Sequence, residues 1–475
     1  VVVLGARGRV AVRVDPFVAV PALTPETNGS SAALASRSAA PGLGATGASA
    51  KPADAGARDP LANVRTTLAR LLRTHQIDAA HYRRYSASLS AAQNAVKHLH
   101  GTRALELGAV IENLHDIAGT GALTASRVPA LILTLDRNRQ WWVNGPLLTD
   151  GQRVEFAGSE LVWEYYRGQG IELQELANFA KANGLYTAGP SFYAQQRELL
   201  AELIPLAADR GGGLAWEYYF HFDGGAPPWT SAMSQATALE ALSRAYQASG
   251  NRAYLILARR ALPVFEVAPP VGVAVKTRLG RRYLLYSFAP GAAVINGFLQ
   301  SVIGLGYYAR VSGDQAAAQL FAAGDAEARA EVPRYDTGAW SLYQSGVEDP
   351  LSYHTVVTGF LQQLCATTRA PVYCVTAAHF VNYLSTPPAL RLLTARLRAG
   401  RPGVVRFRLS KISRVGITLL YDGHTTFLTS APFAYGVGQF RVPAPTRTGT
   451  YAIHLTAKDL AGNYTRIVGA IEVSR

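Results

Sequence analysis

A long series of helix-length segments between residues 167 and 387 constrains the fold of this chain most. Apolar side chains recur at three- and four-residue spacing, and Gly, Pro or Asn separates one segment from the next. The predicted helices cover 171–183, 190–208, 231–249, 251–265, 294–312, 314–331, 352–366 and 371–385. Successive helices of this length are typical of an (α/α) barrel or toroid, or of a helical solenoid. The absence of a strict sequence period argues against a simple repeat array.

Four shorter regions precede this series. Residues 1–19 alternate apolar and basic side chains, which predicts an N-terminal strand or hairpin. Residues 20–58 are rich in Ala, Ser, Gly and Pro, and such a composition predicts a flexible linker. A helical pattern occupies 59–127. Residues 128–166 then contain β-branched and aromatic runs with NG and DG turns, from which we predict a small β insert.

The last segment, 390–475, changes pattern again. Short runs of alternating residues are separated by turn signals, and the stretch LTAKDLAGNYT reads as strand, turn and strand. This pattern predicts an immunoglobulin-like (Ig-like) β-sandwich. We therefore expect a multidomain, mainly α chain, with an (α/α) barrel at 167–389 and the sandwich after it.

Positive charge gathers in the predicted sandwich. The whole chain has a formal net charge of +14, and residues 391–475 carry 13 Lys or Arg against three acids. A basic surface suits a polyanion, so we expect an anionic cell-surface polymer as a partner of this domain. A solvated basic face is the alternative. No base-stacking or groove-reading motif is present, and no nucleic-acid partner is expected.

The remaining composition excludes several classes of site. No apolar run is about 18 residues long, so no transmembrane segment is predicted. Paired CxxC and HExxH motifs are absent, and the glycine runs at 168–170 and 211–213 lack the context of a phosphate loop. We therefore expect neither a metal nor a cofactor. Cys365 and Cys374 pair in an oxidising compartment or remain thiols in a cytosol, and both readings stay open.

Aromatic clusters provide the first indication of a ligand. They occur in WEYY (163–166), WEYYFHF (216–222) and YDTGAWSLY (335–343). Aromatic rings stack on sugar faces and tyrosine hydroxyls reach sugar oxygens, although such clusters also build cores. The third cluster is the more polar one, because Asp336, Gly338 and Ser341 interrupt it.

Four motifs resemble the C-terminal catalytic domain of the D-glucuronyl C5-epimerases. They are WEYYRGQGIELQELANFAKANGLY (163–186), PWTSAMSQATALEALSRAY (228–246), AVINGFLQSVIGL (293–305) and YDTGAWSLY followed by YH (335–354). The motifs occur in the family's order, and the resemblance does not extend to 20–58 or to the predicted sandwich.

The resemblance implies an (α/α) barrel that acts on hexuronic acid residues of an acidic polysaccharide. The C5 proton of glucuronate is removed and returned on the opposite face, which gives iduronate. This reaction needs neutralisation of the carboxylate, a base on one face and an acid on the other. Tyrosine can serve as either when its pKa is lowered. By resemblance, the catalytic residues are Tyr343, Tyr353 and Tyr286.

The resemblance also implies a set of residues around the substrate. The predicted substrate-binding residues are Trp229, Gln235, His354, Asp336, Asn296 and Tyr335. Two positions depart from the family pattern, because Leu285 replaces a Glu before Tyr286 and Gln344 replaces an Arg after Tyr343. Candidates to take over these roles are Glu348, Asp349, Glu164, Arg281 and Arg282.

Rival functions remain open at this stage. Leu285 favours a non-catalytic polysaccharide-binding protein. A uronate lyase would abstract the same proton and expel the C4 substituent, and a hydrolase ranks last because few acids lie in the motifs. A sugar-active barrel with an Ig-like module suggests a secreted or cell-surface bacterial protein whose leader is not present in this chain. The sequence allows a homodimer and does not identify the polymer.

Overall fold

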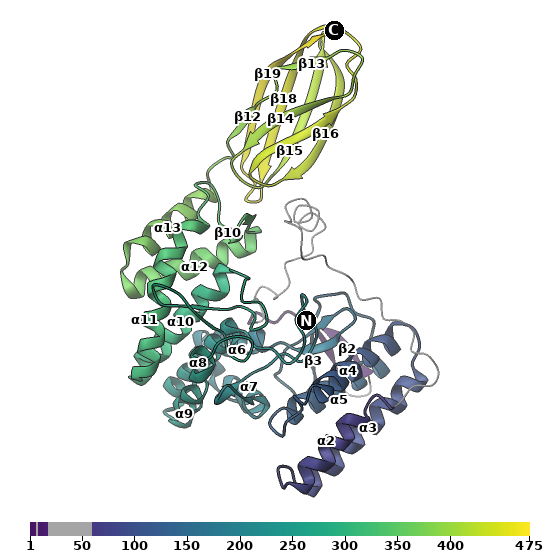
Figure 1. Ribbon diagram of the computed structural model, residues 1–475, viewed down its shortest axis with the longest axis vertical. Coiled ribbons are helices and arrows are strands. Elements are labelled where there is room, and N and C mark those ends of the chain that lie inside the picture. The colour runs from purple at the N-terminus through teal and green to yellow at the C-terminus, as the bar shows by residue number, and fades with distance from the viewer. Residues whose placement is uncertain (6–7, 18–58) are drawn as a thin grey trace. The chain divides into compact units, whose positions relative to one another are not determined.

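The computed structural model of the chain describes residues 1–5, 8–17 and 59–475, and the predicted linker at 20–58 lies outside this range (Figure 1). The described residues form two compact units. The first unit contains residues 1–17, 59–292 and 300–327, within the described range. The second unit contains residues 293–299 and 328–475. Helices and strands contribute to both, so the structure is mixed rather than mainly α.

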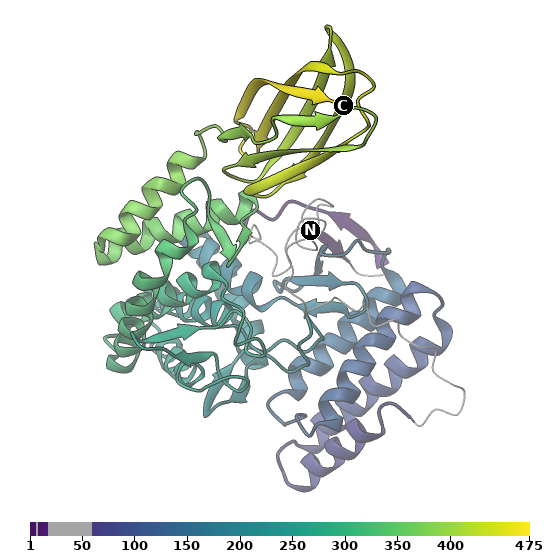
Figure 2. The same ribbon diagram turned by 45° about the horizontal axis from the view of Figure 1, so that its top comes forward.

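The first unit begins with the helices that the spacing at 59–127 predicts. They are α2 (Ala62–Arg73), α3 (Ala79–His98) and α4 (Thr102–Gly119). Helix α2 buries Val64, Leu68 and Leu71, one apolar stripe at helical spacing. The Asp78 side chain caps α3 by accepting a hydrogen bond from the His81 backbone N–H at 2.7 Å. Figure 2 shows these helices with α5 as a group of blue ribbons.

Helix α5 (Val128–Asn144) corrects the prediction that residues 128–166 form a β insert. Its β-branched and aromatic residues suggested strands. However, Leu131, Leu135 and Trp142 recur at helical spacing, and all three are buried. Packing of one helical face outweighs the local preference of single residues for strands. Strands begin only at β3 (Arg153–Phe156) and β4 (Trp163–Tyr166).

A five-stranded sheet incorporates the N-terminal hairpin into the first unit. The hairpin consists of β1 (Val2–Leu4) and β2 (Val10–Val12), and β1 pairs in parallel with β3. The strand order is β2-β1-β3-β4-β5, with β5 at Gly170–Leu173. Strand β5 shifts the helix predicted at 171–183 along the chain, because α6 starts only at Glu175 and continues to Thr187.

The rest of the first unit consists of helices and short two-stranded hairpins. The helices are α6 (Glu175–Thr187), α7 (Tyr193–Leu203), α8 (Ala232–Ser249) and α9 (Ala253–Arg260). The hairpins are β6 (Ala208–Arg210) with β7 (Gly213–Ala215), and β8 (Ala274–Lys276) with β9 (Arg281–Tyr283). Helices α10 (Ile295–Ser312) and α11 (Gln315–Glu331) are each divided between the two units. These bounds agree closely with the helices predicted from spacing.

The second unit contains a helical hairpin, α12 (Leu351–Thr368) and α13 (Pro371–Tyr383). The Cys365–Cys374 disulfide links the two helices across their short connection. A 3₁₀ turn at Val332–Tyr335 and the strands β10 (Leu342–Gln344) and β11 (Val347–Glu348) precede α12. No helix in the described part of the chain has the length and hydropathy needed to span a bilayer.

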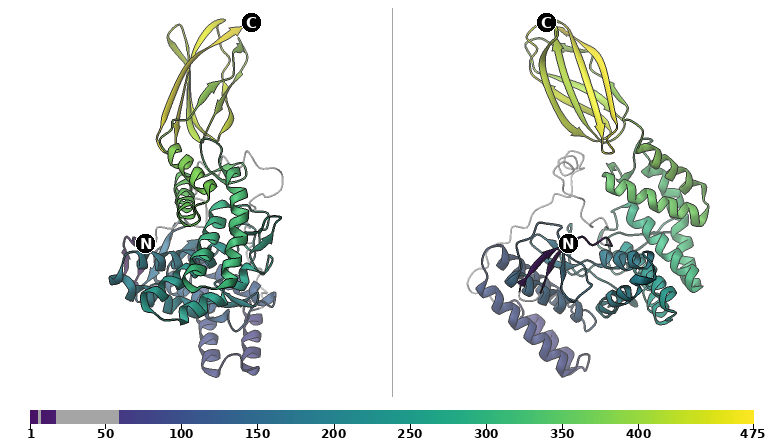
Figure 3. Two further views of the ribbon diagram at one scale, coloured as in Figure 1. Left: turned by 90° about the vertical axis from the view of Figure 1, so that its left-hand side faces the viewer. Right: turned by 180° about the vertical axis from the view of Figure 1, so that it is seen from behind.

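The strand-rich C-terminal region consists of two sheets around one core (Figure 3). One sheet has the order β12-β14-β17, with bounds Leu390–Leu392, Gly403–Leu409 and Gly436–Val442. The other has the order β13-β19-β18-β15-β16, with bounds Arg396–Arg398, Tyr464–Ser474, Gly449–Asp459, Ser413–Tyr421 and His424–Phe433. Alternate residues face inward, and Val405, Phe407, Ile417 and Leu455 are buried completely. The strands predicted at 390–475 are therefore present.

Buried polar contacts join this sandwich to the helical hairpin within the second unit. The Lys411 ammonium donates to the Tyr383 and Thr386 carbonyl oxygens and pairs with Asp459. Glu348, at the end of β11, accepts backbone N–H groups of the sandwich. A buried charge is tolerated when such partners satisfy it. The sandwich is thus attached through specific contacts rather than through a bare linker.

Candidate active site

A tight turn after Tyr335 positions the residues of the YDTGAWSLY motif. One Asp336 carboxylate oxygen accepts the Gly338 backbone N–H at 2.8 Å, and Gly338 adopts a φ of +82°, where a side chain would strain the backbone. A bridge between Asp336 and Ser341 closes the turn. The chain then continues through the β10–β11 hairpin into α12. This path places Tyr343 on β10 and Tyr353 in the first turn of α12.

Tyr343 and Tyr353, two of the predicted catalytic residues, contact each other. Their ring centroids lie 5.4 Å apart, and the ring planes meet at 67°, an edge-to-face arrangement. Tyr353 is buried, with 5% of its surface exposed, whereas Tyr343 is only half-buried. The Tyr343 residue is therefore partly exposed, whereas Tyr353 is buried.

His354, the neighbour of Tyr353, points into a closed polar chain. Its ring stacks on Trp340 with centroids 3.9 Å apart. His354 Nδ1 lies 2.8 Å from Ser341 Oγ, and Nε2 lies 2.9 Å from the Phe380 carbonyl oxygen. The ring is completely buried, and this burial lowers the pKa of His354 to about 4. Both ring nitrogens of His354 are therefore occupied inside the fold, and its role in substrate binding stays a prediction.

Asp349 completes this chain. Its Oδ2 lies 2.5 Å from Ser341 Oγ, and burial raises the pKa of Asp349 to about 7. Neutral His354 must donate from Nε2 to the Phe380 carbonyl, so Nδ1 accepts the only proton of Ser341. A protonated Asp349 can then donate to Ser341 Oγ, which the raised pKa permits near neutrality. Asp349, a candidate to take over the role of the family's missing glutamate, thus belongs to this buried hydrogen-bonded chain.

A second cluster surrounds Asp336 and remains partly exposed. One carboxylate oxygen accepts the Tyr383 hydroxyl at 2.8 Å, and the other lies 2.8 Å from His379 Nδ1. The hydrogen bond to Asp336 adds to burial in raising the pKa of Tyr383. The His379 side chain is 52% exposed and that of Asp336 13%. The sequence analysis missed His379 and Tyr383, although their i, i+4 spacing on α13 places them on one helix face.

Two further predicted residues contact the start of α10 in the second unit. Tyr335, at the end of the 3₁₀ turn, donates its hydroxyl to the Ala293 carbonyl oxygen at 2.7 Å, and Asn296 Oδ1 accepts the Gly297 backbone N–H at 2.7 Å. Both side chains are buried. Their contacts help to fix the entry to α10, and their role in substrate binding stays a prediction.

Trp229 and Gln235 lie in the core of the first unit. Trp229 is 1% exposed, stacks on Tyr218 with centroids 4.2 Å apart and donates from Nε1 to the Phe220 carbonyl oxygen. Gln235 is completely buried and donates to the Trp216 carbonyl oxygen at 2.7 Å. Both side chains therefore have partners inside the core, and their role in substrate binding stays a prediction. An aromatic or amide residue at a helix entrance does not reveal from sequence whether its polar end is already satisfied.

Tyr286, the third predicted catalytic residue, also belongs to the first unit. It is 5% exposed and stacks on Phe288 with centroids 5.4 Å apart, and Trp229 lies at 5.8 Å. Leu285 before it is buried as well. The structure therefore places Tyr286 in an aromatic cluster, and its catalytic role stays a prediction.

The other proposed replacements for the missing Glu and Arg serve internal contacts. Glu348 accepts the backbone N–H groups of Ile412 and Tyr435, each at 2.8 Å, and burial raises the pKa of Glu348 to about 7. Glu164 is completely buried beside Arg153, whose Nε lies 2.7 Å from a carboxylate oxygen. Arg281 donates to the Phe265 carbonyl oxygen at 3.1 Å, and Arg282 lies beside it on β9.

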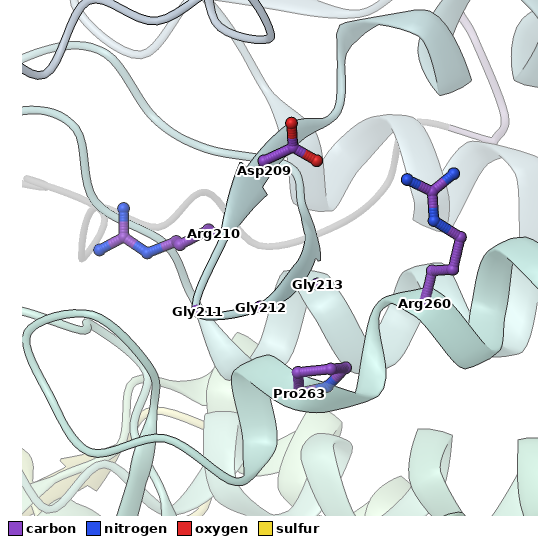
Figure 4. Close-up of a pocket in the computed structure, with 7 residues that line it drawn as sticks. All are labelled: Asp209, Arg210, Gly211, Gly212, Gly213, Arg260 and Pro263. Carbon is purple, nitrogen blue, oxygen red and sulfur yellow. The ribbon is translucent and has the colours of Figure 1, made fainter.

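Glu217 is the centre of a buried charge network in the first unit that the sequence analysis missed. It pairs with Arg127 at 2.7 Å and with Arg210 at 2.5 Å, and accepts the Tyr219 hydroxyl at 3.1 Å. Arg210 also borders a cavity of about 430 Å³ (Figure 4). The cavity is lined by Asp209, Arg210, Gly211, Gly212, Gly213, Arg260 and Pro263. It has no aromatic wall, and it contains none of the predicted tyrosines.

One group of side chains on α4 has the composition of a metal site. Potential ligand atoms of Glu112, His115 and Asp116 lie within 4.8 Å of one another. His115 Nδ1 contacts the Pro60 carbonyl oxygen, and Asp116 pairs with His221 at 3.0 Å. His115 and Asp116 therefore already have partners inside the fold.

The comparisons with known proteins concern the segment that contains all nine predicted site residues. The family described as D-glucuronyl C5-epimerase C-terminus matches residues 210–382. A D-glucuronyl C5-epimerase of Caenorhabditis elegans is 29% identical over 178 residues, which is 33% of this chain and 29% of that protein. An uncharacterised protein of Methanocaldococcus jannaschii is 30% identical over 139 residues, 28% of this chain and 45% of that protein. The chain spans less than half of the length of either relative.

Similar solved structures include a sugar epimerase from a ruminal bacterium, with a TM-score of 0.31, 16% identity and coverage of 44% of this chain and 58% of that one. A GH76 α-mannanase of Bacteroides thetaiotaomicron has a TM-score of 0.36, 12% identity and coverage of 81% and 94%. Residues 210–382 of this chain are therefore similar to the C-terminal region of the D-glucuronyl C5-epimerases, and this similarity rests on the sequence match alone.

Proposed function

We propose that this chain inverts the configuration at C5 of hexuronic acid residues in an acidic polysaccharide. The contact between Tyr343 and Tyr353 carries the proposal, because two phenols meet within the matched segment and one of the two residues is partly exposed. The names of the epimerase relatives support the same chemistry.

Two acid–base groups are the minimum that this reaction requires. The C5 proton is adjacent to a carboxylate, so its removal gives a carbanion whose charge spreads onto the carboxylate oxygens. One group must accept the proton on one face of the ring, and another must deliver a proton on the other. A phenol can perform either step, and each step needs no cofactor. Tyr343 and Tyr353 supply the two phenols, and Asp336 with His379 provides a polar cluster on the same segment and on α13.

We further propose the finer architecture and the location of the protein. The paired helices between 167 and 389 support an (α/α) toroid. Two mainly antiparallel sheets around one core support an Ig-like sandwich at 390–475. The Cys365–Cys374 disulfide supports secretion or display at the cell surface, because disulfides persist in oxidising compartments.

Isotope exchange tests the proposed reaction. The full chain is incubated with a glucuronate polymer in heavy water, and the recovered sugars are examined by NMR and mass spectrometry. We expect deuterium at C5 together with iduronate. Ultraviolet absorbance from an unsaturated uronate would instead identify a lyase. Absence of exchange across a panel of acidic polysaccharides would remove the epimerase proposal.

A non-catalytic polysaccharide-binding role is the second candidate. Leu285, buried where the family resemblance implies a glutamate, favours it, because an aliphatic side chain cannot accept a proton. This role predicts saturable binding of the same polymers, measured by calorimetry, with no deuterium at C5.

A further inference from the structure

The outer face of the β12-β14-β17 sheet carries four arginines and no acidic residue. Alternate residues of these strands face the core, and the others are exposed. The exposed residues are Arg391, Val404, Arg406, Arg408, Val437, Gln439 and Arg441. The sequences of the three strands, LRL, GVVRFRL and GVGQFRV, contain no Asp or Glu. We refer to Arg391, Arg406, Arg408 and Arg441 as the arginine stripe.

The register of the sheet brings the members of the arginine stripe together. Arg391 on β12 lies directly opposite Arg408 on the central strand β14. Arg406 is two residues from Arg408, and Arg441 on β17 lies opposite Val404, two residues further along. Residues two apart share one face, so the stripe crosses three strands and extends about 13 Å along β14 at roughly 3.3 Å per residue.

This arrangement has an energetic cost for the isolated protein. Like charges directly opposite each other on neighbouring strands destabilise a sheet. The three acids of this region do not relieve the repulsion, because Asp422 follows β15, Asp459 ends β18 and Glu472 lies on β19, all in the other sheet. Asp459 is moreover paired with Lys411. The stripe is therefore a concentration of positive charge whose counter-charge the sandwich does not supply.

The outer face of the other sheet has a different character. Its exposed residues on β18 and β19 include Thr450, Ala452, Val468 and Ala470 among a few charges, and Glu472 lies directly opposite Arg396. Arg414 and Lys458 form a like-charge pair at one end of this face, and Arg398 and Arg466 are also exposed on β13 and β19. Positive charge on this sheet is therefore spread over four strands with Glu472 among it, whereas the β12-β14-β17 face carries its arginines without any acidic residue.

We infer that the arginine stripe binds a linear acidic polysaccharide, whose carboxylates supply the missing counter-charge. Planar guanidinium groups match carboxylates with two parallel hydrogen bonds, and regular spacing along a strand suits a polymer with a regularly repeated charge. A nucleic acid fits less well, because the exposed residues of this face include no aromatic ring on which bases could stack. The identity of the polymer as a uronate rests on the proposed function. Binding by the stripe would retain the same polymer on which the helical domain acts.

Paired substitutions with a matched control test this inference. The full chain, the Arg406→Gln/Arg408→Gln variant and the Arg414→Gln/Lys458→Gln variant are compared for binding to a sulfate-free polyglucuronate by calorimetry. Both variants lose two charges, but only the first loses them from the stripe. We expect the stripe variant to bind about tenfold more weakly and the control variant less than about threefold, since exposed single charges contribute little. Affinity of the wild type should fall as salt increases.

A single substitution provides an independent readout. Arg391→Gln removes one partner of the Arg391–Arg408 pair, so it should raise the melting temperature of the free protein slightly while weakening polymer binding. Opposite effects on stability and binding identify a site, whereas a surface that is merely solvated would show no binding loss. Equal losses in the stripe and control variants would overturn the inference in favour of net charge alone. Equal competition by duplex DNA of matched charge would overturn it in favour of nucleic acid.

Failure of this inference is distinguishable from failure of the proposed function. Deuterium exchange is measured in parallel on a short glucuronate oligomer. If exchange occurs and the stripe variant binds polymer as the wild type does, the inference alone fails. If exchange is absent and the stripe variant loses binding, the proposed reaction alone fails.

Discussion

Two sets of side chains from the same segment, 335–354, differ in their surroundings. Trp340, Ser341 and His354 are completely buried, and their polar atoms are satisfied by groups inside the second unit. Asp336 and Tyr343 keep part of their surface exposed. The first set is fixed by internal contacts, and the second is partly exposed. A motif that looks uniform in sequence thus contains both buried and partly exposed side chains.

Helix geometry explains how adjacent residues reach different surroundings. Successive residues of an α-helix point about 100° apart, because one turn contains 3.6 residues. Tyr353 therefore meets Tyr343, while His354 turns toward Trp340 and Phe380. The family resemblance marks both positions, but only the packing distinguishes their roles.

The largest expected effect is the loss of activity in Tyr343→Phe. The substitution removes the phenol oxygen of a partly exposed residue and keeps the ring that packs against Tyr353. If Tyr343 transfers a proton, exchange at C5 should slow by about 10²–10⁴-fold, the usual contribution of a general acid or base. Stability should change by less than about 0.5 kcal/mol. The measurement is the rate of deuterium incorporation, with the melting temperature as control; an unaffected rate would place Tyr343 among the supporting residues.

Trp340→Ala tests the structural role of the buried set, Trp340, Ser341 and His354. It removes a completely buried indole that stacks on His354 and donates to the Asp349 carbonyl oxygen at 2.8 Å. Deletion of a buried aromatic side chain costs about 3–5 kcal/mol, so the free energy of unfolding should fall by this amount. Denaturant titration measures the loss. Trp340→Phe, which keeps a ring in the stack, should recover much of it, and a destabilisation of Trp340→Ala below about 1 kcal/mol would contradict the supporting role.

The bounds of several helices could be predicted from the sequence, whereas the secondary structure of residues 128–166 could not. Apolar spacing placed α8, α12 and α13 within a few residues of their observed bounds, because a helix that buries one face records this in its sequence. The same rule applies to α5, but its run of β-branched and aromatic residues suggested strands instead. Whether such a segment forms a helix or strands depends on its tertiary packing on two sides, which only the folded structure shows.

Tyr343 and Tyr353, which the resemblance groups in one site, contact each other in the structure, and their catalytic role stays a prediction. They lie on a hairpin and on the helix that follows it, so proximity in sequence helped to bring them together. Trp229 and Gln235 looked like cleft residues, but their polar atoms bind backbone groups of Phe220 and Trp216. A sequence lists donors and acceptors without showing which of them are already paired.

Asp349→Asn tests how a buried carboxyl group of this segment makes the stability of the protein depend on pH. Burial raises the folded-state pKa of Asp349 to about 7 from its ordinary 3.8. Its contribution to stability is therefore complete below about pH 4 and is lost as the pH rises through about 7. Asparagine does not titrate, so the melting temperature of the variant relative to wild type should rise by on the order of 5 °C between about pH 5 and pH 8.

His354 provides the internal control for this prediction. Burial lowers the pKa of His354 to about 4, so its contribution has the opposite sign and grows as the pH rises from about 4 to 6.5. In His354→Gln, the melting temperature relative to wild type should therefore fall over that interval. Thermal denaturation in a series of buffers measures both variants, and parallel curves for wild type and Asp349→Asn would show that the carboxyl does not titrate in this range.

The smallest expected effect is that of Tyr383→Phe at the edge of the exposed cluster. The substitution removes one hydrogen bond to Asp336 and leaves the contact with His379 in place. Loss of a single hydrogen bond of this kind costs about 0.5–1.5 kcal/mol, and the exchange rate should fall by less than about tenfold. His379→Gln gives the matched change on the other carboxylate oxygen. If Tyr383→Phe slowed exchange as much as Tyr343→Phe, Asp336 and its partners would have to take part in the proton transfer together with the tyrosine pair. The loss of a positioning contact alone cannot account for so large a decrease in rate.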